Sequence, residues 1–553
     1  MSRDSSDNPR HWDEQLLTAI RHEFSYAFNQ LISKEVDVNK PYDGFPLLMH
    51  AINFGNLEDV SILLDKGADI NWKDVNGNSA LLKAATMKNF RMVEFLLEKG
   101  ANADISGPDG QSLIHLCLES PQALEKALER IPNPDLKDDF GYTPIFRAAA
   151  SFQTLAIELL AKFGADVNFN AVGGIPLTHA VRHSEGRLDA VYCLLAVGAD
   201  VNHKDGNNST ALHYAETAGM IGLLVKGGAE VNVKDNFGNT ALHYLAQQKS
   251  PDPYAVERLI EHGADIDAKN NRGDTPLMWF VRGNSPERLR IVDYLLLGGA
   301  DASLMNNSLK SVLYYACHKG SIQMVSRLHA AGARADFQPS FSQLESYQTP
   351  LHAACISESS EQEVLEVIWY LLEVVRVDVN QVFGLDETAI HYACRRKSSS
   401  ALKLLTDQGR YDAKLEAPDG EGRRPIHLAA GWRSDCFQHL INLGCDVHVT
   451  DDMGRNALHW AAVSNNVDAV RRILDMPNLA IDKRDVNGWT ALCLAAFERP
   501  LFGERPLYTG DTQAETVALL LDKGADKSVQ VLSPEGKIWT PLTIAEIYNA
   551  VDE

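Results

Sequence analysis

A histidine recurs at seven aligned points of this 553-residue chain, each time three residues after a residue that can begin a helix. Histidine exchanges a proton near neutral pH, and its neutral ring is a common metal ligand. A string such as KDNFGNTALHYLAQ, residues 234–247, therefore raises the hypotheses of repeated catalysis or metal binding. The seven residues are His115, His213, His243, His352, His391, His427 and His459.

Two neighbouring H-x-x-C strings add cysteine as a second kind of ligand. A spacing of three places His352 with Cys355, and His391 with Cys394, each on one helix face. Equivalent helices of adjacent repeats pack about 8 to 10 Å apart, whereas ligands of one zinc ion lie within about 4 Å of each other. The spacing therefore argues against a zinc site, and we expect no bound metal.

The residues that replace these histidines in other units indicate whether the position has a chemical or a structural role. Other units carry Met49, Leu82 or Phe146 at the same aligned position, and a catalytic group would not be replaced in this way. Twelve of the fifteen aligned residues three positions earlier are Ser, Thr or Asn. These residues are preferred at helix N-caps, and a polar third helical residue can reach back to the cap. We interpret the histidines as parts of helix starts.

Stepping along the chain from one start to the next gives a period near 33 residues, with insertions. In residues 77–103, Ser79 begins a short helix, an Ala pair follows, and MVEFLL forms a second apolar helix. Gly100 ends that helix, because glycine adopts the left-handed conformation without a Cβ clash. The Asp-, Asn- and Gly-rich segment that comes next predicts a hairpin-like turn. One unit is therefore a turn followed by two antiparallel helices.

Four strings carry a family resemblance: TPLHAAC from Thr349, TALHYAE from Thr210, TALHYLA from Thr240 and NALHWAA from Asn456. They resemble the ankyrin repeat family, whose units have this period and a T-P-L-H-x-A string. The resemblance covers nearly the whole chain and implies an all-α ankyrin-repeat solenoid with short β-hairpin-like turns.

The resemblance also gives the expected organisation. We expect a disordered N-terminus at 1–10, capping helices at 11–41, and about fifteen repeats over 42–553 with insertions near 336–348 and 497–515. The unit between Ser112 and Thr143 is short, and its string SPQALEKALERIPNPD is interpreted as replacing a full second helix and its stop. This interpretation makes the unit a candidate weak point of the stack.

Composition limits the classes of partner. A net charge of -22 repels phosphate backbones and anionic lipid headgroups, so we expect neither nucleic-acid nor membrane binding. A smaller basic area between Arg395 and Arg472 is interpreted as a solvated face. The polar N-terminus resembles no signal peptide, and the eight cysteines contain no C-x-x-C pair. We therefore expect a monomer in the cytoplasm, with the nucleus as the alternative.

No motif for catalysis or cofactor binding is found, and the repeats leave no segment of domain size for a conventional catalytic domain. We predict no catalytic residue, no cofactor and no metal, and hence no enzyme.

Variable residues at the turn tips are the predicted partner-binding positions. The resemblance implies that tips and first helices form a concave face on which partners bind, and aromatic and Arg side chains are common interface anchors. The insertion near 497–515 adds three apolar candidates. The full set is Trp72, Phe140, Tyr142, Phe237, Met453, Arg455, Trp489, Leu501, Phe502 and Tyr508.

The predicted function is a scaffold, adaptor or inhibitor that binds a protein partner on this face. The alternative is an adaptor subunit of an enzyme complex, which recognises substrates for a ubiquitin ligase or organises enzymes of a biosynthetic pathway.

Overall fold

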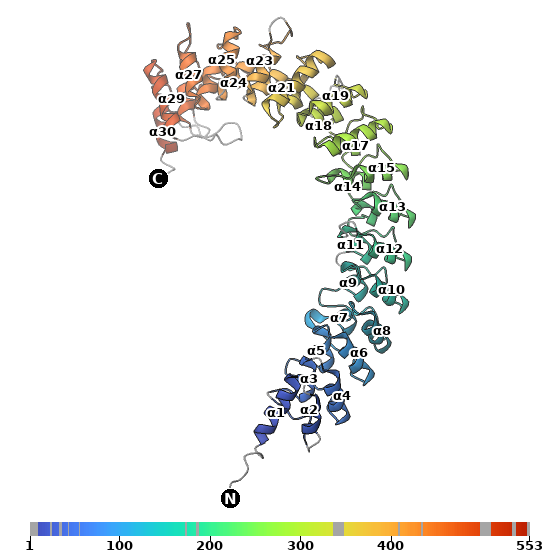
Figure 1. Cartoon of the computed structure of the whole chain (residues 1–553). Coiled ribbons are helices and arrows are strands. Elements are labelled where there is room, and N and C mark those ends of the chain that lie inside the picture. The colour runs from blue at the N-terminus through green and yellow to red at the C-terminus, as the bar shows by residue number, and fades with distance from the viewer. Residues whose placement is uncertain are drawn as a thin grey trace. The chain divides into compact units, whose positions relative to one another are not determined.

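A computed structural model of the chain shows a succession of helix pairs (Figure 1). It describes residues 9–22, 25–32, 36–42, 44–54, 56–171, 174–183, 187–335, 348–396, 398–407, 410–432, 435–497, 510–532 and 538–549. The chain divides into two compact units. The first contains residues 1–245 and 254–264, and the second contains residues 246–253 and 265–553.

Short helices in pairs make up the first unit. Their bounds are α1 Pro9–Arg21, α2 Ser25–Ile32, α3 Leu47–Phe54, α4 Leu57–Asp65, α5 Ala80–Thr86, α6 Phe90–Glu98, η2 Pro108–Gly110, α7 Leu113–Leu116, α8 Pro121–Arg130, α9 Pro144–Ala150, α10 Thr154–Lys162, α11 Pro176–Arg182, α12 Asp189–Ala196, η3 Ala211–Tyr214, α13 Ala218–Lys226 and α15 Pro253–Glu261. Helix α14, Ala241–Gln247, spans the boundary between the two units.

The second unit continues the pattern and adds two short antiparallel strand pairs. Its elements are α16 Pro276–Phe280, α17 Pro286–Leu297, α18 Val312–His318, α19 Ile322–Ala330, α20 Pro350–Cys355, α21 Glu361–Tyr370, η5 Leu371–Val375, β1 Val382–Phe383, β2 Glu387–Thr388, α22 Ala389–Arg395, α23 Ser399–Leu405, α24 Pro425–Gly431, α25 Cys436–Asn442, α26 Ala457–Val463, α27 Val467–Leu474, α28 Ala491–Ala496, α29 Gly510–Asp522, β3 Val531–Leu532, β4 Ile538–Trp539 and α30 Pro541–Asn549. The predicted all-α repeat architecture is confirmed.

Local chemistry explains where each pair begins and ends. At α5, the Ser79 hydroxyl accepts a hydrogen bond from the Leu82 amide at 3.2 Å, which satisfies one of the unpaired donors of the first turn. The second helix of this repeat, α6, is followed by Gly100 with φ 91°, a conformation that side chains with a Cβ rarely adopt. Sequence alone thus sets both ends of the pair.

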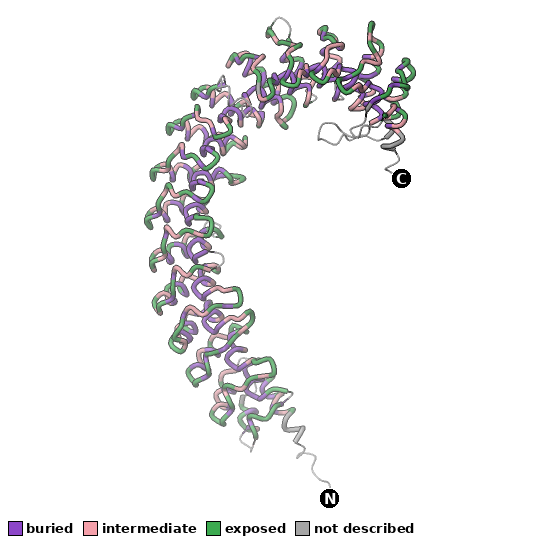
Figure 2. The backbone as a smooth tube through the Cα atoms, turned by 180° about the vertical axis from the view of Figure 1, so that it is seen from behind, coloured by how far each residue is buried: buried purple, intermediate pink, exposed green. Residues whose placement is uncertain are grey.

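Each unit consists of two helix layers. In the first unit α5, α7, α9 and α11 pack in succession, and α6, α8, α10 and α12 form the second layer. The second unit repeats this arrangement, for example with α22, α24 and α26 in one layer. Apolar residues of both layers are buried, and Figure 2 shows buried residues in purple along the succession of helix pairs. Because the Ala84–Ala85 pair of α5 is small and buried, neighbouring first helices can approach closely.

The expectation of a missing second helix between Ser112 and Thr143 is wrong. Helix α8 is a full ten-residue helix with Pro121 in its first turn, and the Ser120 hydroxyl caps it. The short element of this unit is instead the first helix, α7, which has four residues. The string SPQALEKALER is a good helix former because Pro suits the first helical position and most of the residues after it have high helix propensity.

Among the described residues, no helix combines the length and the apolar character that crossing a membrane requires.

Candidate partner-binding surface

The turn tips are held by a buried carboxylate at their first residue. Asp235 is 6% exposed, and its Oδ1 accepts hydrogen bonds from the amides of Phe237 and Asn239, each at 2.8 Å. The same pattern occurs at Asp138, Asp451 and Asp485. These hydrogen bonds restrain the backbone of the tip, and the variable residue at its apex projects from this restrained loop.

Neighbouring tips are joined by backbone hydrogen bonds. The Asn236 amide donates to the Asn207 carbonyl at 2.9 Å, and the Val486 amide donates to the Met453 carbonyl at 2.9 Å. Equivalent bonds join the tips at 109 and 139, at 272 and 307, at 385 and 420, and at 421 and 452. These bonds fix the spacing of the tips that they join.

The recurring histidines fasten one repeat to the next. The Nδ1 atom of His391 accepts the Thr388 amide at 3.1 Å, so the ring proton lies on Nε2, which donates to the Arg423 carbonyl of the following repeat at 3.1 Å. His243 makes the same contact to its own cap, with the Thr240 amide 3.2 Å from Nδ1. The helix-start interpretation is confirmed, and the bond to the next repeat is an addition that the sequence did not reveal.

Burial keeps these rings neutral. Desolvation lowers the pKa of His352, His391 and His459 to about 4, because a positive charge there would lose its hydration. Protonation of Nδ1 would also place its N–H group against the backbone amide that donates to Nδ1 in the neutral ring. These histidines are suited to holding repeats together and poorly suited to proton transfer near neutral pH.

The two H-x-x-C pairs do not form a joint site. The Nε2 atom of His352 faces the Glu387 carbonyl at 3.1 Å, and that of His391 faces a carbonyl of its own next repeat. Burial raises the pKa of the Cys355 thiol to about 12. A hydrogen bond with the Cys436 thiol and burial both raise the pKa of Cys394. In the part of the chain that the structure describes, no group of three or more His, Cys, Asp or Glu residues is arranged to hold a metal ion.

Three predicted partner-binding residues project from the tips. Phe237 is 65% exposed, Phe140 is 56% exposed and Met453 is 40% exposed. The Arg147 guanidinium lies 5.5 Å from the centre of the Phe140 ring, which leaves much of the ring open to solvent. These side chains contribute little to the core and are accessible to solvent.

Four other predicted residues pack within the array and are only partly exposed. Trp72 meets Phe45 edge-to-face at 6.5 Å. The Tyr142 ring stacks on Phe146 at 4.5 Å. Two further contacts complete this group: Arg455 pairs with the Asp485 carboxylate at 3.1 Å, and Trp489 packs on a buried cluster that includes Cys493 and Ile544. Their side chains stabilise tips and the C-terminal core, so they are weaker candidates for binding than the sequence indicated. The remaining three, Leu501, Phe502 and Tyr508, lie outside the described residues.

A row of tyrosines beneath the tips was not predicted. In the first unit, the Tyr214 hydroxyl donates to Asp205 at 2.6 Å, and the Tyr244 hydroxyl donates to Asp235 at 3.0 Å. Arg182 lies 4.0 Å above the Tyr214 ring and 3.5 Å from the Asp205 carboxylate. We call Arg182, Asp205, Tyr214, Asp235 and Tyr244 the tyrosine ladder. The recurrence of an aromatic residue right after the histidine, as in LHY, was the signal in the sequence.

The corresponding part of the second unit is a groove of about 870 Å³ between two tips and α18. Its lining contains four cationic side chains, Arg272, Arg282, Lys310 and Lys319, and one carboxylate, Asp274. We call it the basic groove. The signal for this groove in the sequence was that its two tips begin with an asparagine, Asn270 or Asn306, where tips such as that of Asp235 begin with an aspartate.

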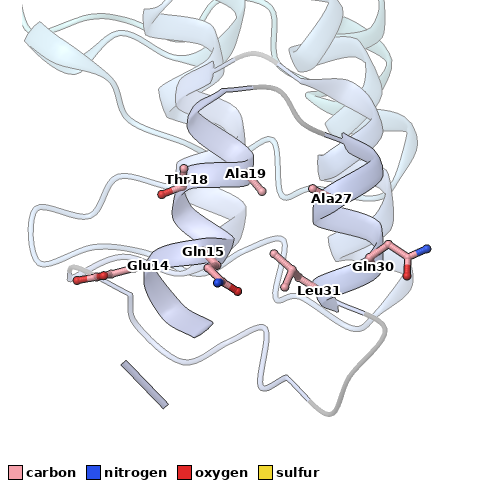
Figure 3. A pocket seen from close by; sticks show the side chains of 7 residues that line it. All are labelled: Glu14, Gln15, Thr18, Ala19, Ala27, Gln30 and Leu31. Carbon is pink, nitrogen blue, oxygen red and sulfur yellow. The ribbon is translucent and has the colours of Figure 1, made fainter. Parts of the chain in front are cut away.

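A smaller hollow of about 510 Å³ lies between α1 and α2 in the first unit. Figure 3 shows Ala19 of α1 facing Ala27 of α2 across it, with Leu31 beside them. The lining is mostly apolar, and it carries no charged side chain except Glu14 at the rim.

The family model for ankyrin repeats, in blocks of three copies, matches most of the chain. Its placements overlap at residues 16–109, 113–205, 177–270, 212–301, 245–338, 287–382, 359–451 and 432–531.

Curated relatives match shorter stretches. Inversin of Canis lupus familiaris is 28% identical over 191 residues, which cover 33% of this chain and 17% of that protein. The nuclear factor NF-kappa-B p105 subunit of Gallus gallus is 28% identical over 190 residues, 34% of this chain and 17% of that protein. Neurogenic locus notch homolog protein 1 of Xenopus tropicalis is 32% identical over 130 residues, 17% of this chain and 5% of that protein. The chain thus matches about a sixth or less of each of these relatives, and these matches indicate no enzyme family.

Proposed function

The chain belongs to the ankyrin repeat family, whose repeats generally mediate protein–protein interactions, and on that premise we propose a non-catalytic scaffold, adaptor or inhibitor. It binds its protein partner on the concave surface formed by turn tips and first helices. The contacting residues are the exposed tip side chains, with Phe140, Phe237 and Met453 as anchors.

The single observation that carries the proposal is the combination of exposure and rigidity at the tips. Phe237 is 65% exposed, yet its backbone amide is held by the buried Asp235 carboxylate at 2.8 Å. An aromatic side chain on a fixed loop loses little conformational entropy when a partner covers it. Residues of this kind are common hot spots of interfaces.

The test compares two triple variants of the full chain. The tip variant is F140A/F237A/M453A. Its matched control is L155A/Y254A/L297A, which removes exposed side chains of the second-helix layer, with exposed fractions of 59%, 56% and 89%. Both variants should keep the circular dichroism and thermal unfolding of the wild type, because none of the six residues is buried.

Quantitative affinity purification with mass spectrometry then supplies partners, and calorimetry with a purified partner supplies the affinity. We expect the tip variant to lose about 1 to 2 kcal/mol of binding free energy per anchor that contacts the partner, while the control binds normally. Equal retention of every partner by the tip variant, or loss only in the control, would contradict the proposed surface.

A further inference from the structure

The basic groove is a local positive region on an acidic protein. The whole chain has a net charge of -22. Within the groove, by contrast, four cationic side chains accompany a single carboxylate. All of the lining residues belong to the second unit: they come from the tips at 271–274 and 306–310, from α18 and the following Lys319, and from Arg282 after α16.

The one carboxylate of the lining is already engaged. Asp274 is 2% exposed, and its Oδ2 accepts the Arg282 guanidinium at 2.8 Å. Its Oδ1 accepts the Asn306 amide group at 2.6 Å. Among the described residues, no ion pair involves Arg272, Lys310 or Lys319. Three cations therefore face solvent without a counter-charge from the groove itself.

Two substitutions at the tips explain this imbalance. The first residue of the tip is Asp in seven other repeats (Asp74, Asp138, Asp205, Asp235, Asp419, Asp451 and Asp485), whereas here it is Asn270 and Asn306. Asn306 Oδ1 still accepts the amides of Ser308 and Lys310, at 3.0 and 2.9 Å. An amide oxygen thus supports the same turn as a carboxylate oxygen does, and the negative charge is absent.

The floor of the groove contacts one of these three cations, Lys310. The Lys310 ammonium lies 4.6 Å from the centre of the Tyr314 ring, and the Tyr314 hydroxyl donates to Gln348 at 2.5 Å. Tyr315 accepts a hydrogen bond from the Asn306 amide group at 3.0 Å. A groove with a fixed floor and cations at its rim presents a defined pattern to a ligand.

The surroundings of His318, at the end of α18, agree with a positive potential. Burial lowers the pKa of His318, and the charges of Lys319, Lys310 and Arg396 lower it further. Only Glu358 acts in the opposite direction. A bound anion would reverse the effect of the cations on this ring.

We propose that the basic groove binds an acidic, carboxylate-bearing segment of a protein partner. The inference rests on the proposed function and names the chemistry of the partner at one site. Carboxylates would pair with Lys310, Lys319 and Arg272, and the intervening backbone would lie over the two tyrosines. A nucleic acid fits less well, because a long polyanion needs many phosphate contacts and would be repelled by the acidic remainder of the surface.

The experiment measures fluorescence anisotropy of a labelled peptide of alternating glutamate and glycine, titrated with the full chain. The variants are K310E/K319E, the milder K310Q/K319Q, and the matched control K226E/K249E, whose two lysines lie outside the groove and make no ion pair among the described residues. A glutamine–glycine peptide and a single-stranded RNA oligonucleotide serve as further ligands. Circular dichroism checks that each variant is folded.

We expect the glutamate peptide to bind, with an affinity that falls as salt rises, and the glutamine peptide not to bind. K310E/K319E should weaken binding by at least about tenfold, the neutral pair by less, and the control pair hardly at all. The His318 resonance should titrate at a higher pH in the presence of the peptide. Equal binding by the wild type and K310E/K319E would overturn the proposal, as would RNA binding that exceeds peptide binding and is lost in the same variant.

The result is independent of the tip experiment. If the peptide fails to bind but F140A/F237A/M453A loses its partner, the basic groove is not an acidic-segment site and the proposed function stands. If the peptide binds as expected and the tip variant retains every partner, the proposed tip surface fails and the groove assignment stands.

Discussion

The tyrosine ladder of the first unit and the basic groove of the second are built on the same repeat and differ in charge. In the ladder, Asp235 accepts two tip amides and the Tyr244 hydroxyl. In the groove, Asn306 accepts two tip amides and donates to the Tyr315 hydroxyl. The tip conformation needs an oxygen acceptor at its first residue, and either side chain supplies one. Electrostatics at these sites can therefore vary while the fold stays constant.

The two regions also differ at the third residue of the first helix. The ladder carries His213 and His243 at this position, whereas the repeats of the groove carry Met278 and Tyr314. His213 lies 3.2 Å from the Asn239 carbonyl of the next repeat through its Nε2 atom. Met278 is buried and has no titratable group in its side chain. At this position the repeats of the groove therefore have no histidine, and Tyr314 donates to Gln348 of the next repeat instead.

The largest expected effect is the loss of the tip acceptor in either region. D235A leaves two tip amides and a tyrosine hydroxyl without their acceptor, and N306A leaves two amides without theirs and breaks the bond to Asp274. Each variant should lose about 2 to 4 kcal/mol of unfolding free energy, measured by urea denaturation with hydrogen exchange to localise the loss. N76A, at an exposed tip residue, serves as the control. If only one of the two variants were destabilised, the shared-tip explanation would be wrong.

Mild acid should loosen repeats that carry the buried histidines before it affects the groove. The pKa of His352, His391 and His459 is about 4 in the folded chain, against about 6.5 when unfolded. Between these two pKa values the unfolded chain binds more protons than the folded chain does. The stabilisation is therefore complete above a pH of about 6.5, and it is lost as the pH falls toward about 4. At a pH of about 5, each of these histidines should lower the free energy of unfolding by roughly 2 kcal/mol relative to neutral pH.

Hydrogen exchange at pH 5 and pH 7 measures this difference repeat by repeat. The helices around His352, His391 and His459 should lose protection at the lower pH, while α16 and α19 lose less. Burial lowers the pKa of His213 as well, so the ladder should follow the histidine-bearing repeats. Uniform loss of protection along the chain would contradict the role assigned to these rings.

Removal of the tyrosine hydroxyls should affect the ladder more than the groove. Y244F removes hydrogen bonds to Asp235 at 3.0 Å and Ser209 at 3.1 Å, so we expect a loss of about 1 kcal/mol. Y315F removes one acceptor from Asn306, which keeps its bond to Asp274, and should cost less. Paired urea denaturation curves measure the two losses of unfolding free energy. A larger loss for Y315F than for Y244F would contradict this prediction.

The smallest expected effect comes from turning a ladder tip into a groove tip. D235N retains the Oδ1 acceptor for both tip amides, and its new amide group can donate to the Tyr244 hydroxyl as Asn306 does to Tyr315. We expect less than about 1 kcal/mol of destabilisation, well below that of D235A. A loss as large as that of D235A would show that the charge itself stabilises the tip.

Much of the fold was readable from single residues and their spacing. Caps such as Ser79 and Thr240, stops such as Gly100, and the alanine pairs fix where each helix begins and ends, since these effects act within one turn of backbone. The helix-start interpretation of His243 was right for the same reason. The exception was the unit after Ser112, where the short spacing was assigned to the second helix although α7 is the short one.

The sequence located the tips of the candidate site, but it did not show which tip side chains are exposed and which pack against the array. Phe237 and Trp489 occupy comparable variable positions, yet Phe237 is exposed and Trp489 packs on Cys493 and Ile544. The partners of Trp489 come from other segments, and Ile544 lies in the last helix of the chain. Exposure at a tip depends on neighbours that local patterns do not specify.

The sequence by itself determined the repeat, its helix boundaries, its turns and the neutral Asn residues at 270 and 306, because each depends on residues a few positions apart. The tertiary structure alone decided that the His391 ring donates to a carbonyl of the next repeat. It also decided that Asp274 forms an ion pair with Arg282 and a hydrogen bond with Asn306. Lys310 and Lys319 consequently share a groove without a counter-charge. The physical reason is that hydrogen bonds and charge balance depend on distance in space, and stacking brings together residues that are about one repeat or more apart in sequence.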